Sequence, residues 1–201
     1  MPRQEWARLS HDAILDAMEE LVERASDRQV PTTNQIAERA GVSVGTLYEY
    51  FDGRRAILHV LYRGHSAQIR ELFVRVSSPH AGAPVSEAVP RFIDALAQAH
   101  AIAPRLHILL VREMLADGGE LMAEVQDPAR ALFEAWLRQH EHEVRPTDLA
   151  TAAGLITVTV EGAIHLQLLA DPARLRDVGW RAEVTDLVLR YLLDDPAPHA
   201  S

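Results

Sequence analysis

Apolar side chains recur along most of the chain at the three- and four-residue steps that are typical of an amphipathic helix. In residues 6–25 this pattern gives one apolar stripe, while aspartates and glutamates occupy the other faces. The stripe consists of Ile14, Met18, Leu21 and Val22. Because such a helix buries one stripe and leaves its polar side in water, the pattern predicts an amphipathic first helix.

Two short apolar-periodic segments follow, over residues 33–40 and 44–51. Thr32 or Thr33 is placed to cap the first of them, and Gly41 is placed to end it. Two short helices joined by a turn of this length have the dimensions of a helix-turn-helix, whose second helix enters the major groove of DNA. This part of the chain is therefore a candidate DNA-binding motif.

The remainder of the chain consists of longer helical stretches with prolines and glycines gathered between them. The stretches predict helices over residues 54–77, 86–102, 104–116, 128–143, 147–170 and 180–193. Pro104 and Pro128 stand at predicted helix starts, where a missing N–H costs least. The β-branched run "ITVTV" at residues 156–160 lies in a long stretch without turn signals, which favours a helix there as well. The predicted fold class is all-α.

The stretch over residues 150–170 is apolar on nearly all sides and carries one carboxylate, Glu161. Its length suits a membrane span, but three threonines, His165 and Gln167 argue against one. A helix of this kind in a soluble protein is buried on both sides. We therefore expect a second copy of the chain to cover its outer side, and we expect no membrane partner.

Composition narrows the class of protein further. The chain has 201 residues, 48% of them hydrophobic, which is enough for a globular core. It has no cysteine and no secretory signal pattern, which predicts a cytoplasmic location. The formal net charge of -9 counts against a general nucleic-acid binder, since phosphate affinity comes from clustered cations. Any contact with DNA must therefore be local.

The helical phase of residues 44–51 predicts which of their side chains face outward. Ser43 precedes the segment as an N-cap, and at 100° per residue Leu47 and Phe51 fall on the same side as Val44. The outward side carries Gly45, Thr46, Glu49 and Tyr50. Glycine permits close backbone approach, threonine can contact a base edge, and a tyrosine hydroxyl can reach a phosphate. The alternative is that the tyrosines only complete a small helical core.

One continuous run resembles a known family. The residues "TTNQIAERAGVSVGTLYEYFDGRRAIL" closely resemble the amino-terminal DNA-binding signature of the TetR family of transcriptional regulators. That signature has a Thr-led helix, then Ile-Ala, Ala-Gly-Val-Ser, Gly-Thr-Leu-Tyr, a Tyr or His before Phe, and Lys-Glu at the start of the next helix. The resemblance covers about residues 10–58, and beyond them it is one of size and helix order only.

The resemblance implies an all-α homodimer that acts as a repressor. Its helix-turn-helix domain, residues 1–53, would bind a palindromic operator in double-stranded DNA with three short helices. A larger helical domain, residues 54–195, would dimerise and bind an unidentified small-molecule effector that releases the DNA, and residues 196–201 would form a flexible tail. We expect no cofactor and no enzymatic activity.

The resemblance also implies which residues lie at the DNA. The positions that match the family's contacts are Thr33, Ser43, Val44, Gly45, Tyr48 and Tyr50. The helical phase agrees for Gly45 and Tyr50 but turns Val44 and Tyr48 inward. Arg54-Arg55 replaces the family's Lys-Glu, and Arg54 still supplies a cation for a phosphate. Residues 1–60 carry seven arginines against ten carboxylates. The carboxylates lie mainly on the first helix, which we expect to face away from DNA.

The larger domain offers candidates for an effector pocket and a dimer interface, each with plain core packing as its alternative. The pocket candidates are Leu110, Met114, Trp136 and His165, with Glu113 or Glu161 as polar anchors. The interface candidates are Val158 and Glu161, together with the stripe Trp180, Val184, Leu187, Val188 and Tyr191. Two helices from each subunit would then form a four-helix interface.

Two other readings of the sequence stay open. The ten histidines invite a metal or catalytic interpretation, but His140 and His142 are two apart and do not share a helix face. Glu161 and His165 do share a face, and a polar pair at an interface or pocket wall is favoured there over a metal site. The chain has no Gly-rich phosphate loop, nucleophile elbow or cysteine pair, so an enzyme is the weaker alternative. The other alternative is a regulator-like dimer that binds a ligand or a protein without a specific operator.

Overall fold

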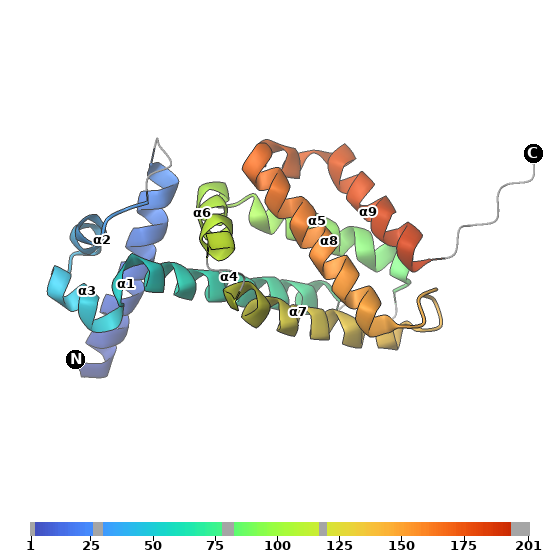
Figure 1. Ribbon diagram of the computed structural model, residues 1–201, viewed down its shortest axis with the longest axis horizontal. Coiled ribbons are helices and arrows are strands. Elements are labelled where there is room, and N and C mark those ends of the chain that lie inside the picture. The colour runs from blue at the N-terminus through green and yellow to red at the C-terminus, as the bar shows by residue number, and fades with distance from the viewer. Residues whose placement is uncertain (1–2, 26–29, 78–82, 117–119, 194–201) are drawn as a thin grey trace, which may run out of the picture. The chain divides into compact units, whose positions relative to one another are not determined.

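The computed structural model describes residues 3–25, 30–77, 83–116 and 120–193, and all regular secondary structure within these ranges is helical (Figure 1). The helices are α1 (Arg3–Arg24), α2 (Thr33–Ala40), α3 (Val44–Tyr50), α4 (Gly53–Ser77), α5 (Val85–His100), α6 (Pro104–Ala116), α7 (Glu120–Gln139), α8 (Leu149–Ala170) and α9 (Val178–Leu192). A short 3₁₀ helix, Pro172–Arg176, joins α8 to α9. The predicted all-α class is confirmed, and the predicted tail at residues 196–201 lies outside the described residues.

The helix boundaries follow the predicted ones closely except at α7. This helix was predicted to begin at Pro128, but it begins at Glu120 and contains Pro128 in its interior. Proline removes one backbone hydrogen bond from a helix without always ending it, and here the helix continues through the proline. The run at residues 156–160 lies inside α8, as predicted, and α5 and α6 are separate helices interrupted before Pro104.

The chain divides into two compact units. The first comprises Met1–His65 and Ala103–Gly118, so it contains α1, α2, α3, the first half of α4 and α6. The fully buried side chains that hold it together are Ile14, Met18, Ile36, Leu47, Ile57 and Leu58. Helix α6 joins this unit through α1, because the Leu106 amide donates a hydrogen bond of 2.7 Å to the Glu23 carboxylate. The predicted boundary after residue 53 separates a DNA-binding domain from an effector-binding domain by function, and it stays a prediction.

The second unit comprises Ser66–Ile102 and Gly119–Ser201 and holds the rest of α4 with α5, α7, α8 and α9. Helix α8 packs against α7, and α5 packs against α9 (Figure 1). The core of this second unit includes Ile93, Leu137, Ile164, Leu168 and Leu175. By length and composition alone α8 could cross a membrane, a test that the core helix of a soluble protein also passes.

Candidate nucleic-acid interface and ligand cavity

The first unit holds α2 and α3 in a fixed relation through caps and a tight turn. A capping box opens α2: the backbone N–H of Gln35 donates to Thr32 Oγ1, and the backbone N–H of Thr32 donates to Gln35 Oε1. Gly41 ends α2 with φ of 70°, a backbone conformation that favours glycine. Ser43 caps α3 by accepting a 3.0 Å hydrogen bond from the Thr46 amide. Local sequence signals therefore determine the geometry of this helix-turn-helix.

The exposed surface of α3 differs from the predicted phase at two positions. Val44 and Tyr48 were predicted to turn inward, but 38% and 55% of their surface is exposed. The centre of the buried face is Leu47, so the phase should be counted from that residue rather than from Val44. Val44 and Tyr50 lie equally far around the helix from Leu47, but only Tyr50 meets α1, through the ring of His11. The correction leaves Val44, Gly45, Tyr48 and Glu49 as the exposed residues of α3.

Two predicted contact residues on this motif are less accessible than expected. Thr46 is half-buried, and its hydroxyl lies 2.9 Å from Ser43 Oγ, so the helix cap already engages it. Tyr50 is half-buried beside His11, whose ring also stacks on Phe51 with centroids 4.9 Å apart. Both residues act first as supports of α3, and the alternative that a tyrosine completes a small core applies to Tyr50.

The two arginines that open α4 have different environments. Gly53 precedes them with φ of 80°, which turns the chain from α3 into α4. Arg55 Nε lies 3.0 Å from the Glu113 carboxylate on α6. Arg54 is exposed and has no hydrogen bond or ion pair within the part of the chain that the structure describes. Arg54 is therefore the available cation of the pair, and Glu113 belongs to the first unit rather than to a pocket in the second.

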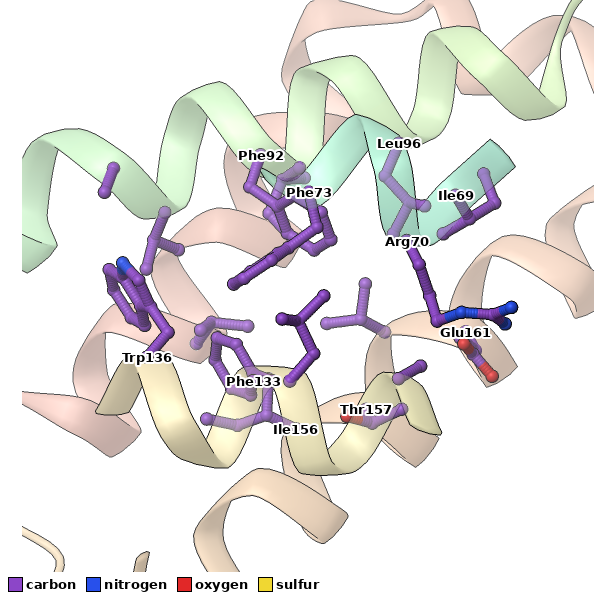
Figure 2. A pocket seen from close by; sticks show the side chains of 17 residues that line it. Ile69, Arg70, Phe73, Phe92, Leu96, Phe133, Trp136, Ile156, Thr157 and Glu161 are labelled. Carbon is purple, nitrogen blue, oxygen red and sulfur yellow. The ribbon is translucent and has the colours of Figure 1, made fainter. Parts of the chain in front are cut away.

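An apolar cavity lies inside the second unit between α4, α5, α7, α8 and α9 (Figure 2). The space open to the centre of a water-sized sphere is about 60 Å³. Four aromatic rings line it, with centroids 4.8 Å apart for Phe73 and Phe92 and 5.6 Å apart for Phe133 and Trp136. The Phe73 ring stands nearly perpendicular to the other three, which is a preferred aromatic geometry.

The polar groups of the cavity are few. Among its 17 lining residues the polar side chains are those of Arg70, Thr157 and Glu161. Figure 2 shows the guanidinium of Arg70 and the carboxylate of Glu161 at the same end, with the Trp136 ring toward the other. An apolar cavity with a few polar groups at one end is typical of a site for a small amphipathic molecule.

The structure brings together only part of the predicted effector residues. Trp136 and Glu161 line the cavity. Leu110 and Glu113 lie in the first unit, His165 is not among the lining residues, and the side chain of Met114 lies outside the described residues. The prediction missed Arg70 and three of the chain's four phenylalanines. The sequence pattern does not show that these side chains, which come from different helices, lie together in the folded chain.

Comparisons with protein families agree with this geometry. Residues 14–61 match the family model described as "Bacterial regulatory proteins, tetR family", which covers the helix-turn-helix. Residues 84–192, more than half of the chain, match the model described as "Tetracyclin repressor-like, C-terminal domain". The chain belongs to the TetR family. Its class is therefore that of a helix-turn-helix transcriptional regulator.

Solved TetR-family structures share the fold. FadR of Thermus thermophilus in complex with lauroyl-CoA is 20% identical, with a TM-score of 0.70 over 95% of this chain and 99% of that one. SmeT, the repressor of the Stenotrophomonas maltophilia multidrug efflux pump SmeDEF, is 19% identical, with a TM-score of 0.70 over 92% and 91%. No curated protein matches the sequence. TetR-family regulators bind DNA as dimers, respond to small molecules and are generally soluble and non-enzymatic, which accords with a cytoplasmic location.

The outer faces of α8 and α9 carry the predicted dimer interface, since TetR-family regulators bind DNA as dimers. Leu155, Val158 and Leu166 are exposed along one side of α8, and Leu187 is exposed on α9. Of the other predicted interface residues, Trp180, Val184 and Tyr191 are half-buried. Val188 was predicted to face a partner, but it is 1% exposed and lines the cavity, because it lies on the inner side of α9 next to Leu187. Glu161 likewise contributes to the cavity.

The buried His100 and the half-buried His165 form a pair in the second unit of this TetR-family protein. The rings of His100 and His165 have centroids 5.6 Å apart, and His100 Nδ1 donates to the Leu96 carbonyl at 2.9 Å. Burial lowers the pKa of His100, and burial together with the charge on His100 lowers the pKa of His165 to about 4. Both rings are therefore neutral near pH 7. Among the described residues no three His, Cys, Asp or Glu side chains are grouped to hold a metal ion.

Proposed function

We propose that this protein is a repressor that a small molecule releases from a palindromic operator. The observation that supports this most is the exposed face of α3 on a rigidly capped helix-turn-helix, where Gly45 and Tyr48 stand free of the core. In a dimer the two α3 helices would enter successive major grooves about 34 Å apart on one side of the duplex. Gly45 would admit close backbone approach, and Tyr48 would contact the phosphate backbone.

Release would depend on α4. Its first half belongs to the unit that carries α3, and its second half supplies Ile69, Arg70 and Phe73 to the cavity. A ligand that binds the DNA-free conformation more tightly than the DNA-bound one shifts the population toward release. Because α8 and α9 would join the subunits, a small rotation of α4 would change the spacing of the two α3 helices and break one half-site contact.

Replacement of Gly45 by alanine is expected to weaken operator binding at least tenfold without harming the fold. A Cβ at this position meets Ser43 Oγ at 3.6 Å, an ordinary contact, so the fold accommodates alanine there. The loss would therefore come from the added methyl group against DNA. Fluorescence anisotropy with the operator and thermal unfolding measure the two effects separately.

Gly64→Ala is the matched control, because Gly64 is helical, lies in the same unit and has open space around a Cβ. It should keep the fold and bind the operator as the wild type does. Equal affinity of the wild type for the operator and for scrambled DNA would instead support the alternative of a dimer without a specific operator.

Replacement of Arg54 by alanine is expected to reduce the salt dependence of operator binding by about one counterion for each subunit. The physical reason is that its guanidinium is exposed and unpaired within the described residues, so it is available to a phosphate. Arg55→Ala is the control, because Arg55 pairs with Glu113. Binding constants measured over a series of salt concentrations give both slopes, and an unchanged slope for Arg54→Ala would contradict this contact.

A further inference from the structure

We infer that the cavity of the second unit binds a small aromatic carboxylic acid, whose ring lies among the aromatic side chains and whose carboxylate pairs with Arg70. This inference rests on the proposed function, because it names the class of molecule that the regulator would sense. Three observations carry it: the size of the cavity, the arrangement of its rings and the state of its two charged residues.

The size limits the ligand to about one ring. A water molecule needs about 10–15 Å³ of space measured at its centre and fills about 30 Å³ of liquid. The cavity, with about 60 Å³ measured in the same way, therefore holds about four to six waters, or about 120–180 Å³ of molecular volume. A single ring with a short acidic substituent fits that volume. A long acyl chain would fit only if the helices around the cavity moved apart.

The rings favour an aromatic body. Phe73 presents its ring nearly perpendicular to those of Phe92, Phe133 and Trp136, whereas Phe133 and Trp136 stack on each other. The lining therefore offers both ring faces and ring edges to a bound molecule. A planar aromatic group can stack on the faces and meet the edges at right angles, whereas an aliphatic chain of the same volume gains only contact area.

The charges favour a single negative charge at the polar end. Arg70 lines the cavity and has no hydrogen bond or ion pair within the described ranges, whereas Glu161 already takes part in an interaction. The unpaired group is therefore the cation, and a guanidinium binds a carboxylate through two parallel hydrogen bonds. Glu161 at the same end would repel a dianion more strongly than a monocarboxylate, which disfavours phosphate esters and coenzyme A conjugates (Figure 2).

The test is calorimetric titration of the full-length protein, without DNA, with 2-phenylacetate, with its neutral amide, with benzylamine and with lauroyl-CoA. We expect the acid to bind at least tenfold more tightly than each of the other three. Arg70→Gln should remove the preference for the acid over the amide. Arg75→Gln is the matched control: it makes the same charge change on an exposed arginine of α4 that does not line the cavity, and it should keep the preference.

Several outcomes would overturn the inference: no binding of the acid up to millimolar concentration, equal or tighter binding of the amide, the amine or lauroyl-CoA, or an undiminished preference in Arg70→Gln. A gel shift with the operator then separates this inference from the proposed function. An acid that binds with the expected preference but leaves the operator bound contradicts release by this ligand while the ligand class stands. Release by a molecule of another class contradicts the ligand class alone.

Discussion

A glutamate in place of Leu187 is expected to convert the protein to monomers and to weaken operator binding at least a hundredfold. Leu187 is 53% exposed on α9, and α8 exposes Leu155, Val158 and Leu166 along one side, so these two helices carry apolar surface that the single chain leaves uncovered. In a symmetric dimer each substitution occurs twice, and an unpaired carboxylate buried in an apolar interface costs several kcal/mol. A monomer could bind only one half-site at a time.

The control for this substitution is Ile102→Glu. Ile102 is apolar and 81% exposed, but it lies between α5 and α6 rather than on α8 or α9, so a charge there should leave the dimer intact. Sedimentation velocity gives the oligomeric state of both variants, and fluorescence anisotropy gives their operator affinity. A Leu187→Glu protein that stays dimeric would place the interface elsewhere. A monomer with wild-type affinity for the full palindrome would contradict the proposed mechanism.

The helix-turn-helix could be predicted from the sequence in detail because short-range signals determine it. The threonine cap, the glycine end of α2 and the serine cap of α3 each act within three or four residues, and the structure has all three. The helical phase of α3 was less accurate, because burial there depends on α1, which contacts Tyr50 and leaves Val44 free. The apolar periodicity of one helix does not show where a neighbouring helix packs against it.

The cavity could not be predicted because it also depends on how several helices pack against one another. Its aromatic rings come from α4, α5 and α7, whose mutual packing is set by contacts across many residues of sequence. The predicted anchor Glu113 pairs with Arg55 in the first unit, and the predicted wall residue His165 pairs with His100. Trp136 and Glu161 were identified as pocket candidates, but Arg70, the cation of the cavity, was not, although its helix belongs to the predicted effector-binding domain.

Acidification is expected to destabilise the second unit through His165. Loss of hydration around this half-buried ring lowers its pKa to about 4, whereas an unfolded histidine keeps its ordinary value of about 6.5. Above pH 6.5 both states are neutral and the folded state has its full stability. As the pH falls from 6.5 to 4, the unfolded chain binds a proton that the folded chain does not, so stability is lost. The shift corresponds to about 3 kcal/mol at pH 4.

The measurement is the free energy of unfolding by urea at a series of pH values from 7 to 4, compared between the wild type and His165→Gln. The variant lacks the titrating ring, so its stability should fall by about 3 kcal/mol less than that of the wild type over this range. The pKa of Glu19 is raised by burial and by the charges of Asp16 and Glu23, which acts in the opposite direction but cancels in the comparison. His142→Gln, at an exposed position, is the control and should follow the wild type. Identical pH profiles for the wild type and His165→Gln would show that the folded protein accommodates a charged His165, and this ring would then have no part in the acid sensitivity of the protein.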